Sequence, residues 1–135
     1  EPIFDLWNSN EDVIGSVANY FKKNGWKKNQ LIMSNLIYEN SNKKYVENES
    51  KKTYKPKTPY KTFMNNKLYS DEIIADNTLL SVIGREEQGG KIYSFAHKNF
   101  YVITRYNRSR LYALAVYSLS NEIKRHKSEL ENHNL

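Results

Sequence analysis

The sequence predicts an α+β fold in which helices near both ends of the chain flank a small antiparallel sheet. Three observations support this prediction. Apolar residues recur at helical spacing near the start, short stretches rich in β-branched and aromatic residues follow one another in the middle, and helical spacing returns near the end. Because helices and strands are segregated along the chain instead of alternating, the pattern favours α+β over α/β.

We expect three regions within the 135 residues. Residues 1–29 form the end of a helical core, 30–106 form a β subdomain with a mobile or disordered loop at 39–59, and 107–135 form a C-terminal helix that returns to the core. The chain begins with Glu1 and not with Met, so we expect that the original start was removed. A mature exported protein and an excised domain both fit this beginning.

The first helix is predicted over about 10–24, where an apolar stripe has helical spacing. Asn24 and Gly25 supply a left-handed stop at its end. Tyr20 lies on the flank of the stripe, so its ring can enter the core while its hydroxyl reaches a groove. The residues that form the stripe are Ile14, Val17, Ala18 and Phe21.

The middle of the chain begins with a strand or two over Gln30–Tyr38. The following stretch, Glu39–Pro59, has Val46 as its only aliphatic residue and is otherwise rich in Lys, Asn, Glu and Ser. Such a composition cannot bury enough apolar surface to offset its ordering entropy, so we expect a mobile surface loop with solvated lysines.

From Tyr60 the pattern becomes β-like, interrupted by a helical turn at Ser70–Asp76. Three strands joined by short loops then lead to the last helix. The strands are expected at Leu79–Gly84, Lys91–Ala96 and Phe100–Tyr106, the loops at Arg85–Gly90 and His97–Asn99, and the helix at about Ser109–Glu131, with a buried stripe of Tyr112, Val116, Leu119 and Ile123.

The composition favours an acidic or stacking partner. The net charge is +6, the pI is about 9.4, and the chain has 11 Tyr, 2 Trp and 5 Phe. Positive charge attracts nucleic acid, an anionic membrane or a carboxylate-bearing polymer such as peptidoglycan. Aromatic rings stack on sugars and on bases alike, so composition alone suits a glycan or a nucleic acid about equally well.

The residues reveal no catalytic constellation, no cofactor motif and no metal site. Cysteine is absent, no phosphate-binding or dinucleotide glycine pattern occurs, and no apolar run approaches the ~20 residues that span a bilayer, so we expect a soluble protein. His97, His126 and His133 are scattered without ligand spacing, so we expect solvated or capping histidines.

Two segments add a specific resemblance. "DLWNSNEDVIGSVANYFKKNGW" (Asp5–Trp26) and "NFYVITRYNRSRLYALAVYSLSNEI" (Asn99–Ile123) closely resemble the C-terminal portion of the membrane-bound lytic murein transglycosylase B family of Gram-negative bacteria. The resemblance implies a lysozyme-like core and cleavage of the β-1,4 bond between N-acetylmuramic acid and N-acetylglucosamine, which leaves a 1,6-anhydromuramyl end. It also implies peptidoglycan strands as partner and a periplasmic location with a lipid anchor in the outer membrane.

The family's catalytic glutamate precedes the "DLWNS" turn, so the resemblance implies that the acid lies upstream and that this chain alone is inactive. It implies that Tyr20, Tyr106, Asn107 and Tyr112 line the glycan groove, and Arg108 can meet carboxylates there. From the residues alone, Asn107 also suits a turn or cap, and Tyr20 and Tyr112 also suit the core.

Family members often carry a calcium loop, of which Asp5 and Asp12 are all that this chain retains, too few oxygens to hold the ion. The main alternative to an enzyme is a non-catalytic glycan-binding module, and a nucleic-acid-binding domain is a distant third. If part of the core is missing, exposed helix faces favour self-association.

Overall fold

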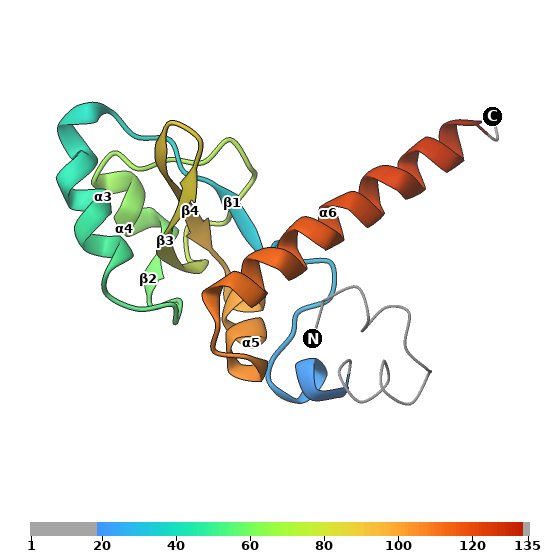
Figure 1. Ribbon diagram of the computed structural model, residues 1–135. Helices are drawn as coiled ribbons and strands as arrows, with labels where there is room; N and C mark the ends of the chain where they lie inside the picture. Colours follow the sequence, from blue (N-terminus) through green and yellow to red (C-terminus); the bar gives the residue numbers. More distant parts are fainter. Residues whose placement is uncertain (1–18, 134–135) are drawn as a thin grey trace. The chain divides into compact units, whose positions relative to one another are not determined.

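The computed structural model describes residues 19–133 (Figure 1). The chain divides into two compact units, Glu1–Asn24 with Ile103–Leu135 and Gly25–Val102. They are called the helical unit and the sheet unit below, after the elements described in each. The boundaries fall after residues 24 and 102, whereas the sequence placed them after 29 and 106. The predicted helix over 10–24 lies mostly outside the described residues; its described part, residues 19–23, is helical.

The sheet unit contains four antiparallel strands in the order β1-β4-β3-β2. Strands β3 and β4 form a hairpin whose pairing runs from Ser81 opposite Ala96 to Glu87 opposite Gly90. The two strands predicted here are therefore confirmed, but the predicted loop at Arg85–Gly90 shrinks to a tight turn because β3 continues further. The strand bounds are Met33–Asn35 (β1), Thr58–Pro59 (β2), Leu79–Glu87 (β3) and Gly90–Ala96 (β4).

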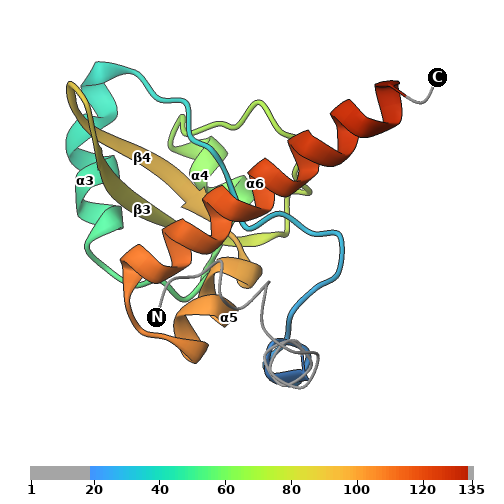
Figure 2. The same ribbon diagram turned by 45° about the vertical axis from the view of Figure 1, so that its right-hand side comes forward.

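One face of this sheet carries the core of the unit (Figure 2). Val46 from helix α3 (Lys43–Ser50) and Phe63 from helix α4 (Tyr60–Asn65) are fully buried there. They contact alternate residues of the hairpin, as expected when one face of a pleated sheet is covered by helices. The hairpin residues in this cluster are Leu80, Val82, Tyr93 and Phe95.

The mobile loop predicted at 39–59 is wrong, because this stretch contains the short 3-10 helix η1 (Asn40–Asn42) and helix α3. Composition suggested too little apolar surface for order. The helix needs little of its own, since Val46 and the partly buried Tyr45 pack against a cluster that the sheet and α4 supply. Tertiary packing thus offsets an ordering entropy that the local sequence cannot offset alone.

Two further local predictions between Tyr60 and Asp76 are wrong. The β-like stretch begins with helix α4, where Tyr60 and Phe63 share one buried helical face, and the helical turn at Ser70–Asp76 is irregular. The Ser70 N–H donates to the Tyr60 hydroxyl at 2.9 Å. This bond anchors the irregular segment to α4.

The strand predicted at Phe100–Tyr106 is also wrong, because helix α5 spans Lys98–Tyr106. The sequence alternates as in a strand, but it also has apolar residues at helical spacing. Phe100 and Ile103, three positions apart, are both fully buried. The predicted loop at His97–Asn99 becomes the helix start, where the His97 carbonyl accepts from the Phe100 N–H at 3.1 Å. Burial of this face outweighs the strand propensity of its β-branched residues.

The side chain of Asn99 ties the entry of the sheet unit to its exit. Asn99 is 1% exposed; its Oδ1 accepts from the Lys27 N–H at 2.7 Å, and its Nδ2 donates to the carbonyls of Lys27 at 2.8 Å and Gln30 at 3.2 Å. Three hydrogen bonds from a buried amide satisfy backbone groups that no strand pairs. Residues 72 positions apart are therefore held side by side.

Of the two roles predicted for His97, solvated or capping, the solvated one is wrong; the residue stands directly before α5. The ring is 8% exposed, and its Nε2 lies 2.9 Å from the Ser34 hydroxyl on strand β1. Burial lowers the pKa of His97 to about 4, so the imidazole is neutral at pH 7. A neutral ring bonded to a hydroxyl adds no charge to the interior.

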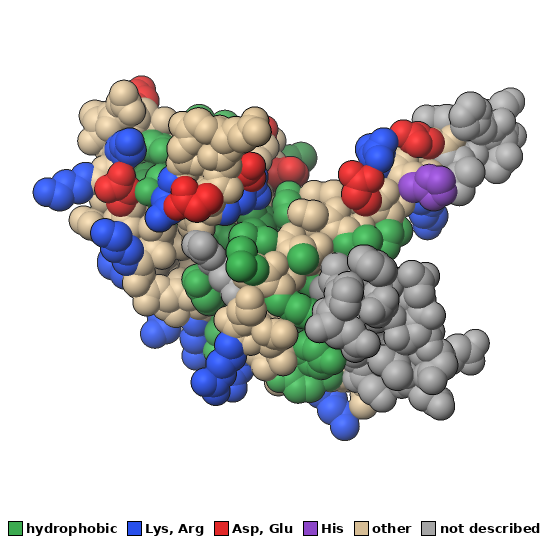
Figure 3. All heavy atoms as spheres, in the orientation of Figure 1, with side chains coloured by type: hydrophobic (Ala, Val, Ile, Leu, Met, Phe, Trp, Pro, Cys, Tyr) green, Lys and Arg blue, Asp and Glu red, His purple; other side chains and the backbone are tan. Residues whose placement is uncertain are grey.

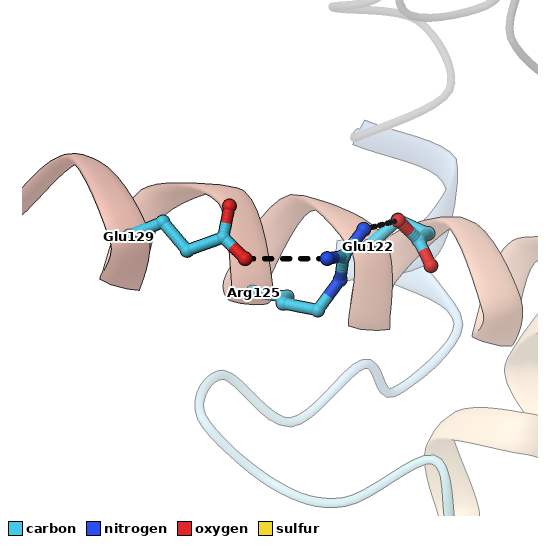
Figure 4. Close-up of polar contacts among 3 residues, drawn as sticks. All are labelled: Glu122, Arg125 and Glu129. Carbon is cyan, nitrogen blue, oxygen red and sulfur yellow. Dashed lines mark hydrogen bonds and ion pairs between the residues drawn. The ribbon is translucent and has the colours of Figure 1, made fainter.

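The predicted last helix is confirmed as α6 (Arg110–His133). Its predicted buried stripe holds only in part, since Val116 is 6% exposed whereas Ile123 is 46% exposed. Beyond the stripe, Arg125 pairs with Glu122 at 2.6 Å and with Glu129 at 3.2 Å, which supports the exposed turns (Figure 4).

None of the helices within residues 19–133 is long and apolar enough to cross a bilayer.

Val46→Ala tests whether α3 is part of the core. We expect it to lower the free energy of unfolding by about 2 kcal/mol, because it removes two buried methyl groups and leaves a cavity. Lys44→Ala, at an exposed position of the same helix, should change it by less than about 0.5 kcal/mol. Urea unfolding measures both, and equal small effects would restore the mobile-loop interpretation.

The neutral buried His97 predicts a loss of stability in acid. Its folded pKa of about 4 is below the unfolded value of 6.5, so the unfolded chain binds more protons between these values. The stability that this group contributes is present above pH 6.5 and is lost as the pH falls towards 4. The free energy of unfolding of His97→Gln should therefore decline less steeply over this range than that of the parent chain. Identical slopes in denaturant titrations would contradict the assignment.

Candidate functional site

Three tyrosines from distant parts of the sequence converge in the helical unit. The rings of Tyr20 and Tyr106 are 5.2 Å apart between centroids in an edge-to-face arrangement, and those of Tyr106 and Tyr112 are 6.0 Å apart and tilted by 35°. Phe21 adds an edge contact to Tyr106 at 5.8 Å. Such offset and edge-to-face pairs are the favoured geometries of aromatic clusters. The three tyrosines, with Phe21, are called the tyrosine cluster below.

The turn between α5 and α6 fixes the angle between Tyr106 and Tyr112. The Oδ1 of Asn107 accepts from the Ser109 N–H at 2.9 Å, and the Ser109 hydroxyl accepts from the Tyr112 N–H at 3.3 Å. The first bond makes an Asx-type turn and the second caps the start of α6. The junction is thus a turn between two helices and not the strand-to-helix junction that the sequence predicted.

A backbone carbonyl of the same turn region holds Tyr20 in place. Its hydroxyl donates to the Arg105 carbonyl at 2.7 Å. This carbonyl lies in the last turn of α5, where carbonyl groups lack partners within the helix. The bond orients the Tyr20 ring against Tyr106 and leaves its hydroxyl already engaged.

Tyr112 differs, because its hydroxyl is buried and has no hydrogen-bond partner among the described residues. Burial, with a smaller contribution from Tyr106, raises the pKa of the Tyr112 phenol, so it stays protonated and can donate. A buried hydroxyl without a partner costs free energy, and such groups in native proteins call for an explanation.

Asn107 and Arg108 follow Tyr106 directly and are both exposed. Asn107 does serve the turn, which was the alternative reading of this residue, but its Nδ2 has no partner within residues 19–133. The structure thus brings the three predicted tyrosines together and places the two polar residues at the end of α5. Their role in binding stays a prediction. Phe21 was assigned only to the core stripe, and its position beside Tyr20 was the signal for its contact with Tyr106.

No carboxylate accompanies the tyrosine cluster in the described part of the helical unit. The carboxylates whose side chains are described there, Glu122 and Glu129, pair with Arg125. Glu122 lies ten positions beyond Tyr112 on the same helix, about 15 Å along its axis. Across residues 19–133, no group of three acidic or histidine side chains is placed to hold a metal ion, and Asp5 and Asp12 lie outside the described residues. The described part of the site can bind and orient a ligand through its aromatic rings and amide.

Comparisons with known proteins place these residues in a sequence family. The family described as the Transglycosylase SLT domain matches residues 2–121. Membrane-bound lytic murein transglycosylase B of Escherichia coli (strain K12) is 31% identical over 119 residues, which are 88% of this chain and 31% of that protein. The chain therefore spans about a third of the length of this curated relative.

Solved structures of lytic transglycosylases are also similar to this chain. The catenated lytic transglycosylase SltB1 from Pseudomonas aeruginosa is 32% identical, with a TM-score of 0.74 over 87% of this chain and 38% of that chain. The Escherichia coli lytic transglycosylase Slt35, in complex with bulgecin A, is 28% identical, with a TM-score of 0.70 over 87% and 35%. These likenesses confirm the predicted α+β fold, with terminal helices of a lysozyme-like core and a small antiparallel sheet.

Removing the hydroxyl of Tyr20 and that of Tyr112 tests whether the first is hydrogen-bonded and the second is not. Tyr20→Phe removes the bond to the Arg105 carbonyl and should lower the free energy of unfolding by about 0.5–1 kcal/mol. Tyr112→Phe removes a buried hydroxyl without a partner and should leave stability unchanged or raise it. Thermal unfolding compares them, and a larger loss for Tyr112→Phe would show that its hydroxyl is bonded within the chain.

Proposed function

Because the chain belongs to the Transglycosylase SLT domain family, we propose that it is the C-terminal part of a lytic transglycosylase that cleaves peptidoglycan. The observation that carries this proposal is the 31% identity to a murein transglycosylase over 88% of the chain. The bond cleaved is the β-1,4 link between N-acetylmuramic acid and N-acetylglucosamine, and the product is a 1,6-anhydromuramyl end. The similarity to a membrane-bound murein transglycosylase supports a location in the cell envelope. We further propose a lipid anchor in the outer membrane.

In this proposal the tyrosine cluster forms one wall of the glycan groove. Ring faces of Tyr106 and Tyr112 pack on the apolar C–H faces of a pyranose. The Tyr112 hydroxyl, buried in the structure without ligand, donates to a sugar oxygen or an N-acetyl carbonyl once binding uncovers it. The exposed Asn107 amide adds a donor, and Arg108 pairs with a lactyl or peptide carboxylate. Tyr20, already bonded to the chain, supports the wall from behind.

The catalytic acid in this proposal lies on polypeptide upstream of Glu1. A single glutamate protonates the leaving glycosidic oxygen as the bond to the muramyl anomeric carbon breaks. It then takes the proton of the muramyl 6-hydroxyl as that oxygen attacks the same carbon, so water does not enter. The chain spans 31% of the length of its curated relative, which agrees with this division. The chain alone should therefore bind glycan without cleaving it.

Extending the chain upstream tests catalysis. The longer protein should release muropeptides that lack one water relative to hydrolysed products, as mass spectrometry detects. In it, Tyr112→Phe should lower kcat/KM about tenfold, because one hydrogen bond to the sugar is lost without loss of stability. Release of hydrated ends would make the enzyme a hydrolase, and no release at all would leave a non-catalytic glycan-binding module.

Binding by the present chain is tested separately with soluble glycan strands. Tyr106→Ala should weaken binding about fivefold to tenfold through loss of ring contact. Tyr69→Ala is a matched control, because Tyr69 is 46% exposed in the sheet unit whereas Tyr106 is 39% exposed in the cluster. If the two substitutions weakened glycan binding equally, the proposal that the tyrosine cluster lines the groove would be wrong.

A further inference from the structure

A cavity of about 770 Å³ lies within the sheet unit, next to the start of α5. Three lysines line it, Lys27, Lys55 and Lys98, and none of the described lining residues is acidic. Each lysine comes from a different segment: the entry to the unit, the connection from α3 to β2, and the first turn of α5. Within residues 19–133 these lysines make no ion pair with a carboxylate. The cavity therefore concentrates positive charge that the described residues do not neutralise.

The structure holds two of these lysines in defined positions. The buried Asn99 amide binds the backbone of Lys27 on both its N–H and its carbonyl, which fixes where that residue faces the cavity. Gly25 has φ +93°, and a Cβ built on it would lie 2.9 Å from Lys98 Cε. The missing side chain at Gly25 thus leaves room for the Lys98 stem. The Lys98 ammonium lies 5.4 Å from the centre of the Tyr101 ring, a cation–π contact.

The helix start adds to the positive potential. α5 has nine residues and no acidic residue in its first turn, so the positive end of its dipole is not offset there. Lys55 also lines a smaller neighbouring hollow together with Lys57 and with Lys52, which pairs with Glu49 there. In the space-filling view, Lys and Arg side chains gather over the α3 and β2 region of this unit (Figure 3). Such a field raises the local concentration of anions before they reach the cavity.

We propose that this cavity binds a short acidic peptide carrying at least two carboxylates. Its volume is that of a site for an organic molecule, and a single inorganic ion would fill little of it. The separated lysines match spaced carboxylates, and the amides of Gln30 and Asn77 match peptide groups. Leu31 and Leu79 offer apolar contact to the carbon atoms between them. The site lies in the sheet unit, so the proposal does not depend on the function assigned to the tyrosine cluster.

The test is calorimetric titration of the chain with a synthetic triglutamate peptide at low salt, and with triglutamine as the uncharged counterpart. Triglutamate should bind, and triglutamine should bind at least tenfold more weakly. The double variant Lys55→Gln with Lys98→Gln should weaken triglutamate binding about tenfold or more, because two charge-assisted contacts are lost. Lys61→Gln, at an exposed position of α4 outside the cavity, should change it less than twofold.

Two outcomes would overturn the proposal. If Lys61→Gln weakens triglutamate binding as much as Lys55→Gln alone does, the attraction belongs to the whole basic surface. If inorganic phosphate displaces triglutamate at the concentration of the peptide itself, the cavity takes any anion and is not a peptide site. Circular dichroism and urea unfolding of the double variant confirm the fold, and loss of binding with the fold intact supports the proposal.

Discussion

The arrangement of the sheet unit's entry and exit depends on one buried side-chain amide. Asn99 closes the sheet unit by bonding the segment where the chain enters, at Lys27 and Gln30, to the helix by which it leaves. The backbone groups at Lys27 and Gln30 belong to no strand. The Gln30 N–H donates to the Lys27 carbonyl at 3.2 Å, but without Asn99 the Lys27 N–H and the Gln30 carbonyl would need water or other partners. With entry and exit fixed together, the unit presents both of its connections at one place. Lys27 and Lys98 lie together at the cavity for the same reason.

The tyrosine cluster rests on a second set of short-range bonds. Asn107 and Ser109 set the turn between α5 and α6, and that turn decides that Tyr106, ending one helix, meets Tyr112, in the first turn of the next. Local hydrogen bonding thus builds a surface whose third member, Tyr20, lies 85 positions from the carbonyl that its hydroxyl binds. Among the described residues, the buried Tyr112 hydroxyl and the exposed Asn107 Nδ2 are donors of this surface without a partner. Side chains that are already held by packing and hydrogen bonds are suited to orienting a ligand, because little ordering entropy remains to be lost on binding.

Sequence reasoning succeeded where the signal was local and strong. The hairpin of β3 and β4 and the long helix α6 have clear periodicity, and the resemblance named the tyrosines that converge. It failed where packing decides the local structure. Phe100–Tyr106 alternates like a strand, yet its burial against the rest of the fold makes it a helix, and Val46 orders a polar stretch that composition marked as mobile. The burial of His97 and the cavity beside it could not be predicted from the sequence, because both form where segments far apart along the chain meet.

The joined ends of the sheet unit have a consequence for how such proteins vary. Holding the two ends of a segment side by side costs loop-closure entropy. This cost grows only slowly with the number of residues between the ends, so lengthening the segment adds little to it. The stretch bounded by Lys27 and Asn99 is thus a natural module for insertion, shortening or exchange, provided that the asparagine and its carbonyl partners are kept. Variation among homologous chains can therefore accumulate in this module while the helices that carry the tyrosines keep their spacing.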